Sequence, residues 1–202
     1  MLPDYSEAKE KMVAVRYRNE QDVTRLAGID ACEEKNLVVE LYCGNGGSTK
    51  LFEAAKFKNI VSNDINRESP VAQTFMSADK FIRTELPKLG KIDLIDFDAY
   101  GCPSEEIKQY FSLRQRQDLP LVVTISDGLG IWMKRSKNTK RLRERYMLGE
   151  MEFDERHPWR EHPLLLDQFM HNIGKLYMME VTTLVMMQTK FKNYTLGAWL
   201  FT

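Results

Sequence analysis

Apolar residues in this chain come in short blocks separated by longer, more polar stretches. Four almost unbroken blocks lie at residues 37–43, 59–64, 92–97 and 119–126. Apolar runs of this length are typical of strands buried on both faces of a parallel sheet. The intervening stretches predict helices at residues 48–57, 80–88 and 104–116. Strands that alternate with helices predict an α/β domain with a mostly parallel sheet.

The C-terminal pattern is different. Residues 164–177 fit an amphipathic helix. Residues 179–189 and 194–201 are rich in strand-forming residues and are joined by a short turn, so they predict an antiparallel hairpin. A nicotinamide-binding Rossmann domain would instead continue with a parallel sixth strand.

The N-terminal residues 1–36 form a separate segment that we predict to be helical in two pieces. The second piece runs from Glu20 to Cys32, and Gly28 is expected to end or kink it. The preferred interpretation is a helical cover for the sheet, and the alternative is a lid that faces a substrate. The chain then divides into this cover and one α/β domain over residues 37–202.

A glycine-rich turn follows the first predicted strand. Gly44, Gly46 and Gly47 lie between that strand and the next helix, and Asp64 ends the following apolar run. Glycines allow a tight turn that comes close to a ligand, and an acid at this spacing can accept both ribose hydroxyls of a nucleotide-like ligand. The dinucleotide pattern G-x-G-x-x-G is not met, because the sequence from Gly44 reads G-N-G-G-S-T. A glycine-rich turn in another kind of α/β protein is the alternative.

Composition places few limits on function. The 202 residues are 43% hydrophobic and 29% charged, and 29 basic residues balance 29 acidic ones, as in an ordinary soluble domain. No apolar run approaches the roughly 18 residues of a membrane span, and the N-terminus does not resemble a secretory signal. The three cysteines are scattered. We therefore expect a cytoplasmic protein with no disulfide frame, no metal and no membrane partner.

The segment Glu40-Leu-Tyr-Cys-Gly-Asn-Gly-Gly47 resembles the first motif of class I S-adenosylmethionine (SAM)-dependent methyltransferases, [D/E]-x-G-x-G-x-G, with Tyr42 in the first glycine place. The resemblance implies a Rossmann-like fold with a seven-stranded, mostly parallel sheet and a C-terminal antiparallel hairpin. It implies SAM as cofactor, and a buried acid suits the cationic SAM better than a pyrophosphate. The cofactor-binding residues that it implies are Glu40, Tyr42, Gly44, Gly46, Asp64, Ile65, Asp79 and Asp98. Asp79 has a compatible structural interpretation as the N-cap of the next helix.

A second motif bears on the substrate. Asp98-Ala-Tyr-Gly-Cys-Pro103 resembles the D-P-[FY]-G-x-P motif of the tRNA guanine N2-dimethyltransferase family, and residues 121–130 resemble that family's V-T-x-T-D strand end. Ala99 replaces the motif's proline, and the chain has no room for the large C-terminal domain of the cellular tRNA enzymes. The resemblance implies that Asp98 accepts hydrogen bonds from a target amine and that Tyr100 stacks on the base.

The expected function is SAM-dependent methyl transfer to an exocyclic amine of a nucleobase, with guanine N2 in tRNA-like RNA as the first choice. Adenine N6 in DNA, or an amine of a protein or small molecule, is the alternative substrate. A catalytically inactive SAM-fold binding subunit is the non-enzymatic alternative.

One basic segment stands out in this neutral chain. It comprises Lys134, Arg135, Lys137, Lys140, Arg141 and Arg143. Such a cluster can bind nucleic-acid phosphates, RNA in preference to DNA in this case, and the alternative is a solvated helix face. His157 and His162 lack the helical spacing of metal ligands, so we interpret them as loop residues.

Overall fold

A computed structural model describes residues 20–128, 138–189 and 194–202 of the chain. They form a seven-stranded sheet in the order β3-β2-β1-β4-β5-β7-β6. The strands are β1 (Leu37–Glu40), β2 (Asn59–Asp64), β3 (Thr74–Phe75), β4 (Leu94–Asp98), β5 (Leu121–Asp127), β6 (Val181–Gln188) and β7 (Thr195–Phe201). The first five strands are parallel, and β7 pairs antiparallel with both β5 and β6. The predicted fold, with its closing antiparallel hairpin, is confirmed.

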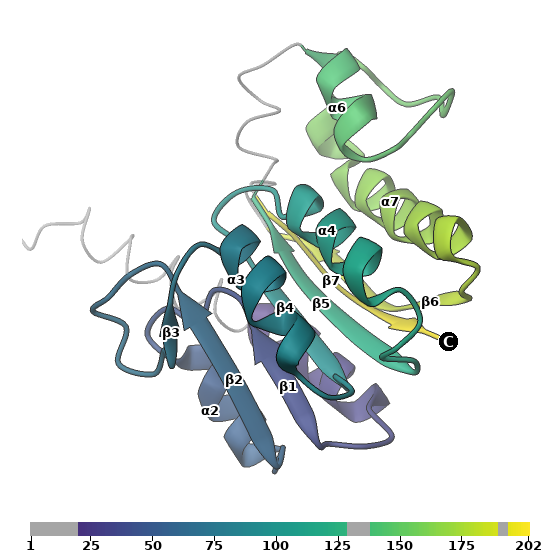
Figure 1. Cartoon of the computed structure of the whole chain (residues 1–202). Coiled ribbons are helices and arrows are strands. Elements are labelled where there is room, and N and C mark those ends of the chain that lie inside the picture. Colours follow the sequence, from purple (N-terminus) through teal and green to yellow (C-terminus); the bar gives the residue numbers. More distant parts are fainter. Residues whose placement is uncertain (1–19, 129–137, 190–193) are drawn as a thin grey trace, which may run out of the picture.

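Helices cover both faces of the sheet (Figure 1). The helices are α2 (Gly47–Ala54), α3 (Ala78–Thr84), α4 (Ser104–Arg114), α6 (Thr139–Arg145) and α7 (His162–Tyr177), with short 3-10 helices η1 (Leu86–Lys88) and η2 (Pro158–Arg160). Residues 20–31 are also helical. One face is covered by α3, α4 and α7, and the other by α2 and the helix of residues 20–31. None of the helices among the described residues has the length and apolar character needed to cross a membrane.

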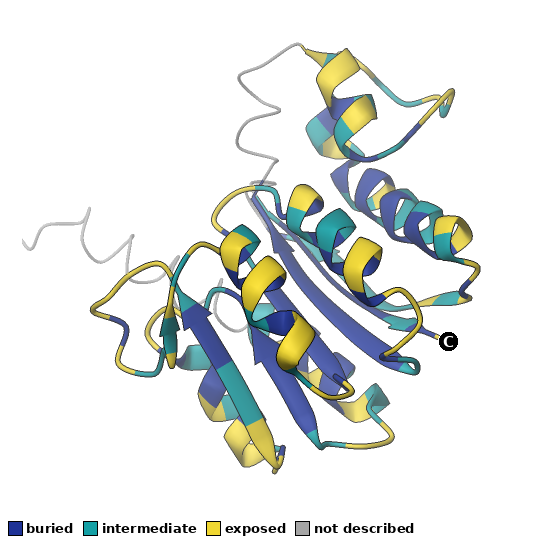
Figure 2. Cartoon of the chain, viewed as in Figure 1, coloured by how far each residue is buried: buried dark blue, intermediate teal, exposed yellow. Residues whose placement is uncertain are grey.

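The two faces of the sheet bury different amounts of apolar surface. The larger core contains Val39, Ile95 and Val123 from the strands and packs beneath α3, α4 and α7. The smaller core contains Val38 and Leu94 and packs beneath α2 and the helix of residues 20–31. Figure 2 shows the consequence, since the central strands β1, β4, β5 and β7 are dark blue along most of their length, while the helices show yellow on their outer sides. Burial on both faces explains why the strands read as unbroken apolar runs.

Several boundaries differ from the sequence prediction. The helix predicted at residues 80–88 is divided into α3 and η1. Pro87 explains the division, because proline cannot donate a helical hydrogen bond and disfavours helical geometry in the preceding residue. The N-cap of α3 is Ser77, whose hydroxyl accepts from the Lys80 amide, so the interpretation of Asp79 as N-cap was wrong. Asp79 lies in the first turn of α3 and not at the end of a strand.

Gly28 does not end its helix. The helix continues to residue 31, and Gly28 lies against β5. A Cβ atom at this position would lie 2.8 Å from Thr124 Cγ2 and 3.1 Å from Val122 Cγ1. The glycine therefore allows the helix to approach β5 closely, and the expectation that it ends the helix was wrong.

Candidate active site

The glycine-rich turn and the acid of β2 meet at the carboxyl ends of the strands. Gly44 and Gly46 have positive φ angles of 51° and 78°, which side-chain-bearing residues rarely adopt. Asp64 Oδ2 accepts from the Gly44 amide at 2.7 Å, and Oδ1 accepts from the Asn66 amide at 2.8 Å. Each oxygen keeps a lone pair for a further donor. Ile65, next in the chain, is 72% exposed and presents an apolar side chain beside this turn.

Glu40 lies beneath this turn and is only 1% exposed. Its Oε2 accepts from Ser62 Oγ at 2.8 Å, whereas its Oε1 has no hydrogen-bond partner among the described residues. Burial raises the pKa of Glu40, and the nearby hydroxyls of Ser48 and Thr49 partly offset this rise. A buried carboxylate oxygen without a donor is costly, so the site is suited to a ligand that brings a donor or a positive charge.

Tyr42 links the loop after β1 to the first turn of α4. Its ring packs partly buried against the larger core, and its hydroxyl lies beside the Glu106 carboxyl in the first turn of α4. Burial raises the pKa of Glu106. Sequence analysis did not identify Glu106 as part of the site, because nothing in the pattern brings α4 next to the glycine-rich turn.

Asp79 is held by two helices. Gln109 Nε2 of α4 donates to Asp79 Oδ1 at 3.1 Å, and Arg83 of α3 forms an ion pair with Oδ2. These contacts link α3 to α4. A role for Asp79 in recognising the cofactor stays a prediction.

Asp98 ends β4 and is bound by the helix of residues 20–31. Arg25 Nη2 donates to Asp98 Oδ2 at 2.6 Å, and Gln21 Nε2 donates to Oδ1 at 2.7 Å. The same arginine donates through Nε to Asp96 Oδ2 at 3.0 Å, and Thr124 Oγ1 donates to Asp96 Oδ1 at 2.6 Å. Arg25 is 5% exposed, so this is a buried ion network at the edge of the sheet.

Charge balance explains how the network is tolerated. Burial lowers the pKa of Arg25, but Asp96 and Asp98 together raise it by more, so the guanidinium stays charged. Burial raises the pKa of Asp96, and Arg25 opposes that rise. Sequence reasoning missed both Arg25 and Gln21, because a polar residue on an amphipathic helix gives no sign of the strand it reaches.

The loop after β4 presents Tyr100. Its side chain is 94% exposed, whereas the preceding Ala99 is buried. The Gly128 amide donates to the Gly101 carbonyl at 2.8 Å. A Cβ atom at Gly128 would lie 2.5 Å from the Tyr100 carbonyl oxygen and 2.8 Å from Tyr194 Cε1. Tyr194 therefore packs at the same loop, and it was not identified from the sequence.

A buried polar cluster lies behind this loop. Tyr146 donates to Asp127 Oδ2 at 2.7 Å, and its oxygen is 2.8 Å from His162 Nε2. Burial lowers the pKa of His162, which is fully buried as the first residue of α7. The interpretation of His162 as a loop residue was wrong. The cluster joins the ends of β5, α6 and α7.

The basic segment is described only in part. Lys134, Arg135 and Lys137 lie outside the described residues. On α6, Lys140 and Arg141 are exposed. Figure 1 places this helix on the side of the sheet toward which the parallel strands point.

Arg143 differs from its neighbours on α6. Its guanidinium donates to Glu155 Oε1 and to the carbonyls of Gly149 and Met151, and it lies 4.7 Å from the centroid of the Phe153 ring. These contacts fix the following loop. A role for Arg143 in nucleic-acid binding stays a prediction.

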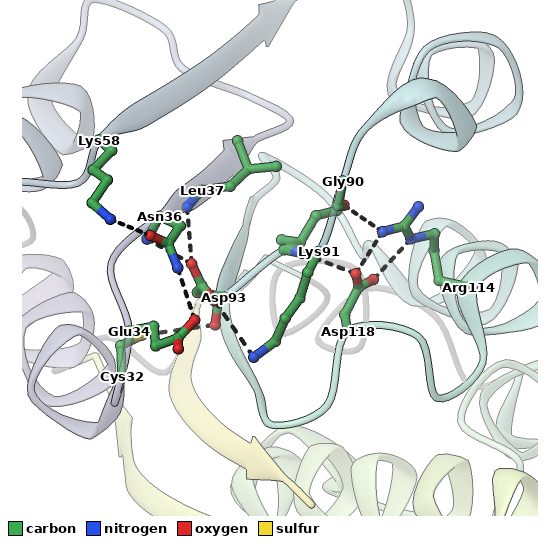
Figure 3. Close-up of polar contacts among 11 residues, drawn as sticks. Cys32, Glu34, Asn36, Leu37, Lys58, Gly90, Lys91, Asp93, Arg114 and Asp118 are labelled. Carbon is green, nitrogen blue, oxygen red and sulfur yellow. Dashed lines mark hydrogen bonds and ion pairs between the residues drawn. The ribbon is translucent and has the colours of Figure 1, made fainter.

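Polar contacts also occur at the amino ends of the parallel strands, and Figure 3 shows them. Asp93 Oδ2 accepts from the amides of Asn36 and Leu37 at 2.7 and 2.9 Å, and Asp118 accepts from Arg114 and the Ile92 amide. A cavity of about 60 Å³ beside Asp93 is too small for a nucleotide-sized ligand. No group of three potential metal ligands occurs among the described residues.

The sequence matches no family model and no curated protein. Its fold does match solved structures. The plantazolicin methyltransferase BamL, solved with a triazolic desmethylPZN analog and SAH, has a TM-score of 0.56 at 9% identity, over 96% of this chain and 86% of that one. A putative O-methyltransferase from Klebsiella pneumoniae gives 0.54 at 13% identity, over 91% and 79% of the two chains. The methyltransferase domain of bacterial CtHen1-C gives 0.53 at 11% identity, over 91% and 98%.

At these identities the likeness establishes a class I methyltransferase fold and nothing finer. The resemblance to the tRNA guanine N2-dimethyltransferase family therefore rests on the two sequence motifs alone.

Proposed function

We propose that this protein transfers the methyl group of SAM to an exocyclic amine of a nucleobase, with guanine N2 in RNA as the first choice. The observation that supports this most directly is the placement of Asp98. Its carboxylate is anchored by Arg25 and lies at the strand tip beside the exposed Tyr100, one strand away from the glycine-rich turn. Ligands of open α/β sheets bind at this edge.

Of the eight cofactor-binding residues that the motif resemblance implies, four have contacts or backbone geometry that support the assignment. Asp64 has spare lone pairs that can accept hydrogen bonds from the ribose hydroxyls. Glu40 has a buried oxygen that can accept a hydrogen bond from a cationic group of the cofactor. Gly44 and Gly46 shape the backbone between them. SAM, when bound, supplies an electrophilic methyl group on a sulfonium. SAH in the solved BamL complex is the demethylated form of this cofactor, which supports the choice.

The acceptor side answers a chemical difficulty. The lone pair of an aromatic amine is delocalised into its ring, so the amine is a weak nucleophile. A carboxylate that accepts its hydrogen bonds increases the electron density on nitrogen and orients it. Asp98 can do this because Arg25 fixes the carboxylate from the side of the sheet, and Tyr100 can stack on the base. Such positioning supplies a large part of the barrier reduction.

The second candidate keeps the reaction and changes the acceptor to an amine of a protein or small molecule. The likeness to BamL favours it, since that plantazolicin methyltransferase was solved with a triazolic desmethylPZN analog. The exposed Lys140 and Arg141 favour the nucleic acid. Adenine N6 in DNA and an inactive SAM-fold subunit are the remaining alternatives.

The test compares RNA from cells with and without the protein. The RNA is digested to nucleosides, whose masses are measured by mass spectrometry. In a second experiment, purified protein is incubated with unmodified RNA and labelled SAM. We expect a methylated guanosine that depends on the protein and disappears with Asp98→Ala. Labelling of DNA or of a small amine, with none in RNA, would contradict the RNA assignment. The absence of SAM binding would contradict the enzymatic assignment as a whole.

A further inference from the structure

The helix of residues 20–31 places a side-chain amide against Asp98. Gln21 Nε2 donates to Asp98 Oδ1 at 2.7 Å and to Ser126 Oγ at 2.9 Å. The two hydrogens of this NH₂ group therefore have two acceptors, one on β4 and one on β5. An NH₂ group on a planar sp² carbon is also the chemical form of an exocyclic amine on a nucleobase. The protein itself supplies the donor that Asp98 is proposed to receive from a substrate.

We propose that the Gln21 carboxamide occupies the target-amine subsite and has to leave it before the substrate amine binds. This inference rests on the proposed function, because Asp98 defines the subsite only if it receives the target amine. The pair of acceptors, Asp98 and Ser126, then selects a primary amine, since a group with one hydrogen satisfies only one of them.

The surrounding contacts allow Gln21 to leave without loss of the site. Arg25 holds both Asp98 and Asp96, so the helix stays attached to the sheet when the Gln21 bonds are broken. Gln21 is only half-buried, whereas Arg25, one turn further along the helix, is buried. The oxygen that Gln21 releases is Oδ1, and Arg25 continues to hold Oδ2. Asp98 thus remains anchored while one oxygen becomes free.

Competition of this kind has a measurable consequence. A protein whose binding-competent state is only partly populated binds its ligand more weakly by that fraction. Removing the carboxamide should therefore strengthen the binding of amines and leave other ligands unaffected. A purely structural role predicts the opposite, because loss of the hydrogen bonds to Asp98 and Ser126 would weaken the site without any selectivity.

The experiment uses the full chain saturated with SAH. Wild type and Gln21→Ala are titrated in a calorimeter with guanosine, adenosine and cytidine. Each is compared with a control nucleoside that lacks the exocyclic amine; this partner is inosine for the two purines and uridine for cytidine. We expect Gln21→Ala to bind at least one amine-bearing nucleoside about tenfold more tightly than wild type, with no gain for its partner. Gln21→Glu, whose carboxylate is repelled by Asp98, should show the same gain and serves if the alanine variant folds poorly.

Two controls accompany these variants. Gln168→Ala removes an amide that bonds Asn172 on α7, and it should bind every nucleoside as wild type does. Adding Asp98→Asn to Gln21→Ala should abolish the gain. Equal gains for amines and their partners, or no gain in a variant that still binds SAH, would overturn the proposal. If neither wild type nor variant binds SAH, the proposed function itself is wrong, and the Gln21 proposal is wrong with it.

Discussion

Buried carboxylates have different surroundings at the two ends of the parallel strands. We call the side of the sheet where these strands begin the amino edge, and the side where they end the carboxyl edge. At the amino edge, Asp118 accepts from the Ile92 amide, the Tyr110 hydroxyl and two nitrogens of Arg114, which fills the roughly four lone pairs of a carboxylate. At the carboxyl edge, Glu40 keeps one oxygen without a donor among the described residues, and the two oxygens of Asp98 accept from Gln21 and Arg25 respectively.

The difference separates structure from function. A carboxylate whose lone pairs are all used contributes to the fold and has nothing left for a ligand. A buried carboxylate with spare capacity costs stability, and such costs persist where the group has another use. We therefore place the proposed site at the carboxyl edge, although the amino edge also contains a network of polar contacts (Figure 3).

The largest expected effect is at the amino edge. Asp118→Ala leaves the buried Arg114 guanidinium and the Tyr110 hydroxyl without their shared acceptor, so we expect it to lower the free energy of unfolding by about 3–5 kcal/mol. Denaturant unfolding measures this. SAM affinity of the remaining folded protein should not change, and a variant that loses SAM affinity with full stability would contradict the comparison.

Asp98→Ala tests the carboxyl edge. We expect methyl transfer to fall at least about a hundredfold, because the target amine loses its acceptor, while SAM affinity stays close to that of wild type. Radiolabel transfer and calorimetry measure the two quantities. Full activity in this variant would remove Asp98 from the reaction.

Asp64→Ala should weaken SAM binding about tenfold to a hundredfold, which corresponds to the roughly 1.5–3 kcal/mol of hydrogen bonds to a charged group. Calorimetry with SAH measures the change. Asp93→Ala is the control at the opposite edge and should cost stability instead. Unchanged affinity in the Asp64 variant would argue against ribose binding.

The burial of His162 should make the stability of the fold depend on pH. Burial lowers the pKa of His162 in the folded protein, whereas the unfolded chain has the ordinary value near 6.5. Between these two values only the unfolded chain takes up the proton. The contribution of His162 therefore makes stability fall as the pH falls below about 6.5, by at most about 1.4 kcal/mol per pH unit. Unfolding measured from pH 7 downward should show this slope in wild type and a smaller slope in His162→Gln; identical slopes would contradict it.

The smallest effect is expected on α6. Lys140→Glu together with Arg141→Glu should make RNA binding less dependent on salt, and the slope should fall by roughly one for each phosphate that the variant no longer neutralises. Fluorescence titrations at several salt concentrations measure the slope. An unchanged slope would mean that this part of the basic segment is a solvated helix face.

Strands β1, β2, β4 and β5 could be predicted because each contains a nearly continuous apolar run, whereas the two-residue strand β3 (Thr74–Phe75) leaves no such signal. The C-terminal hairpin was equally clear. Boundaries were less accurate where a single residue decides them, as Pro87 divides α3 from η1 and Gly28 passes over β5 without ending its helix. Local pattern does not say whether a glycine breaks an element or allows it to pack.

The site was predictable where its residues follow strand ends. Gly44, Asp64 and Asp98 each lie at the tip of an apolar run, and parallel strands bring their carboxyl ends to one edge. Gln21, Arg25 and Tyr194 were missed, because each reaches Asp98 or Tyr100 from far along the chain.

The sequence alone therefore determined a layered α/β fold and the edge at which chemistry is possible, because apolar runs and glycines act through their immediate neighbours. Only the tertiary structure decided which carboxylates are saturated and which keep spare capacity. That property depends on donors such as Arg25, which reaches Asp96 and Asp98 across 71 and 73 positions of the chain, so packing and not proximity in the chain chooses its partners.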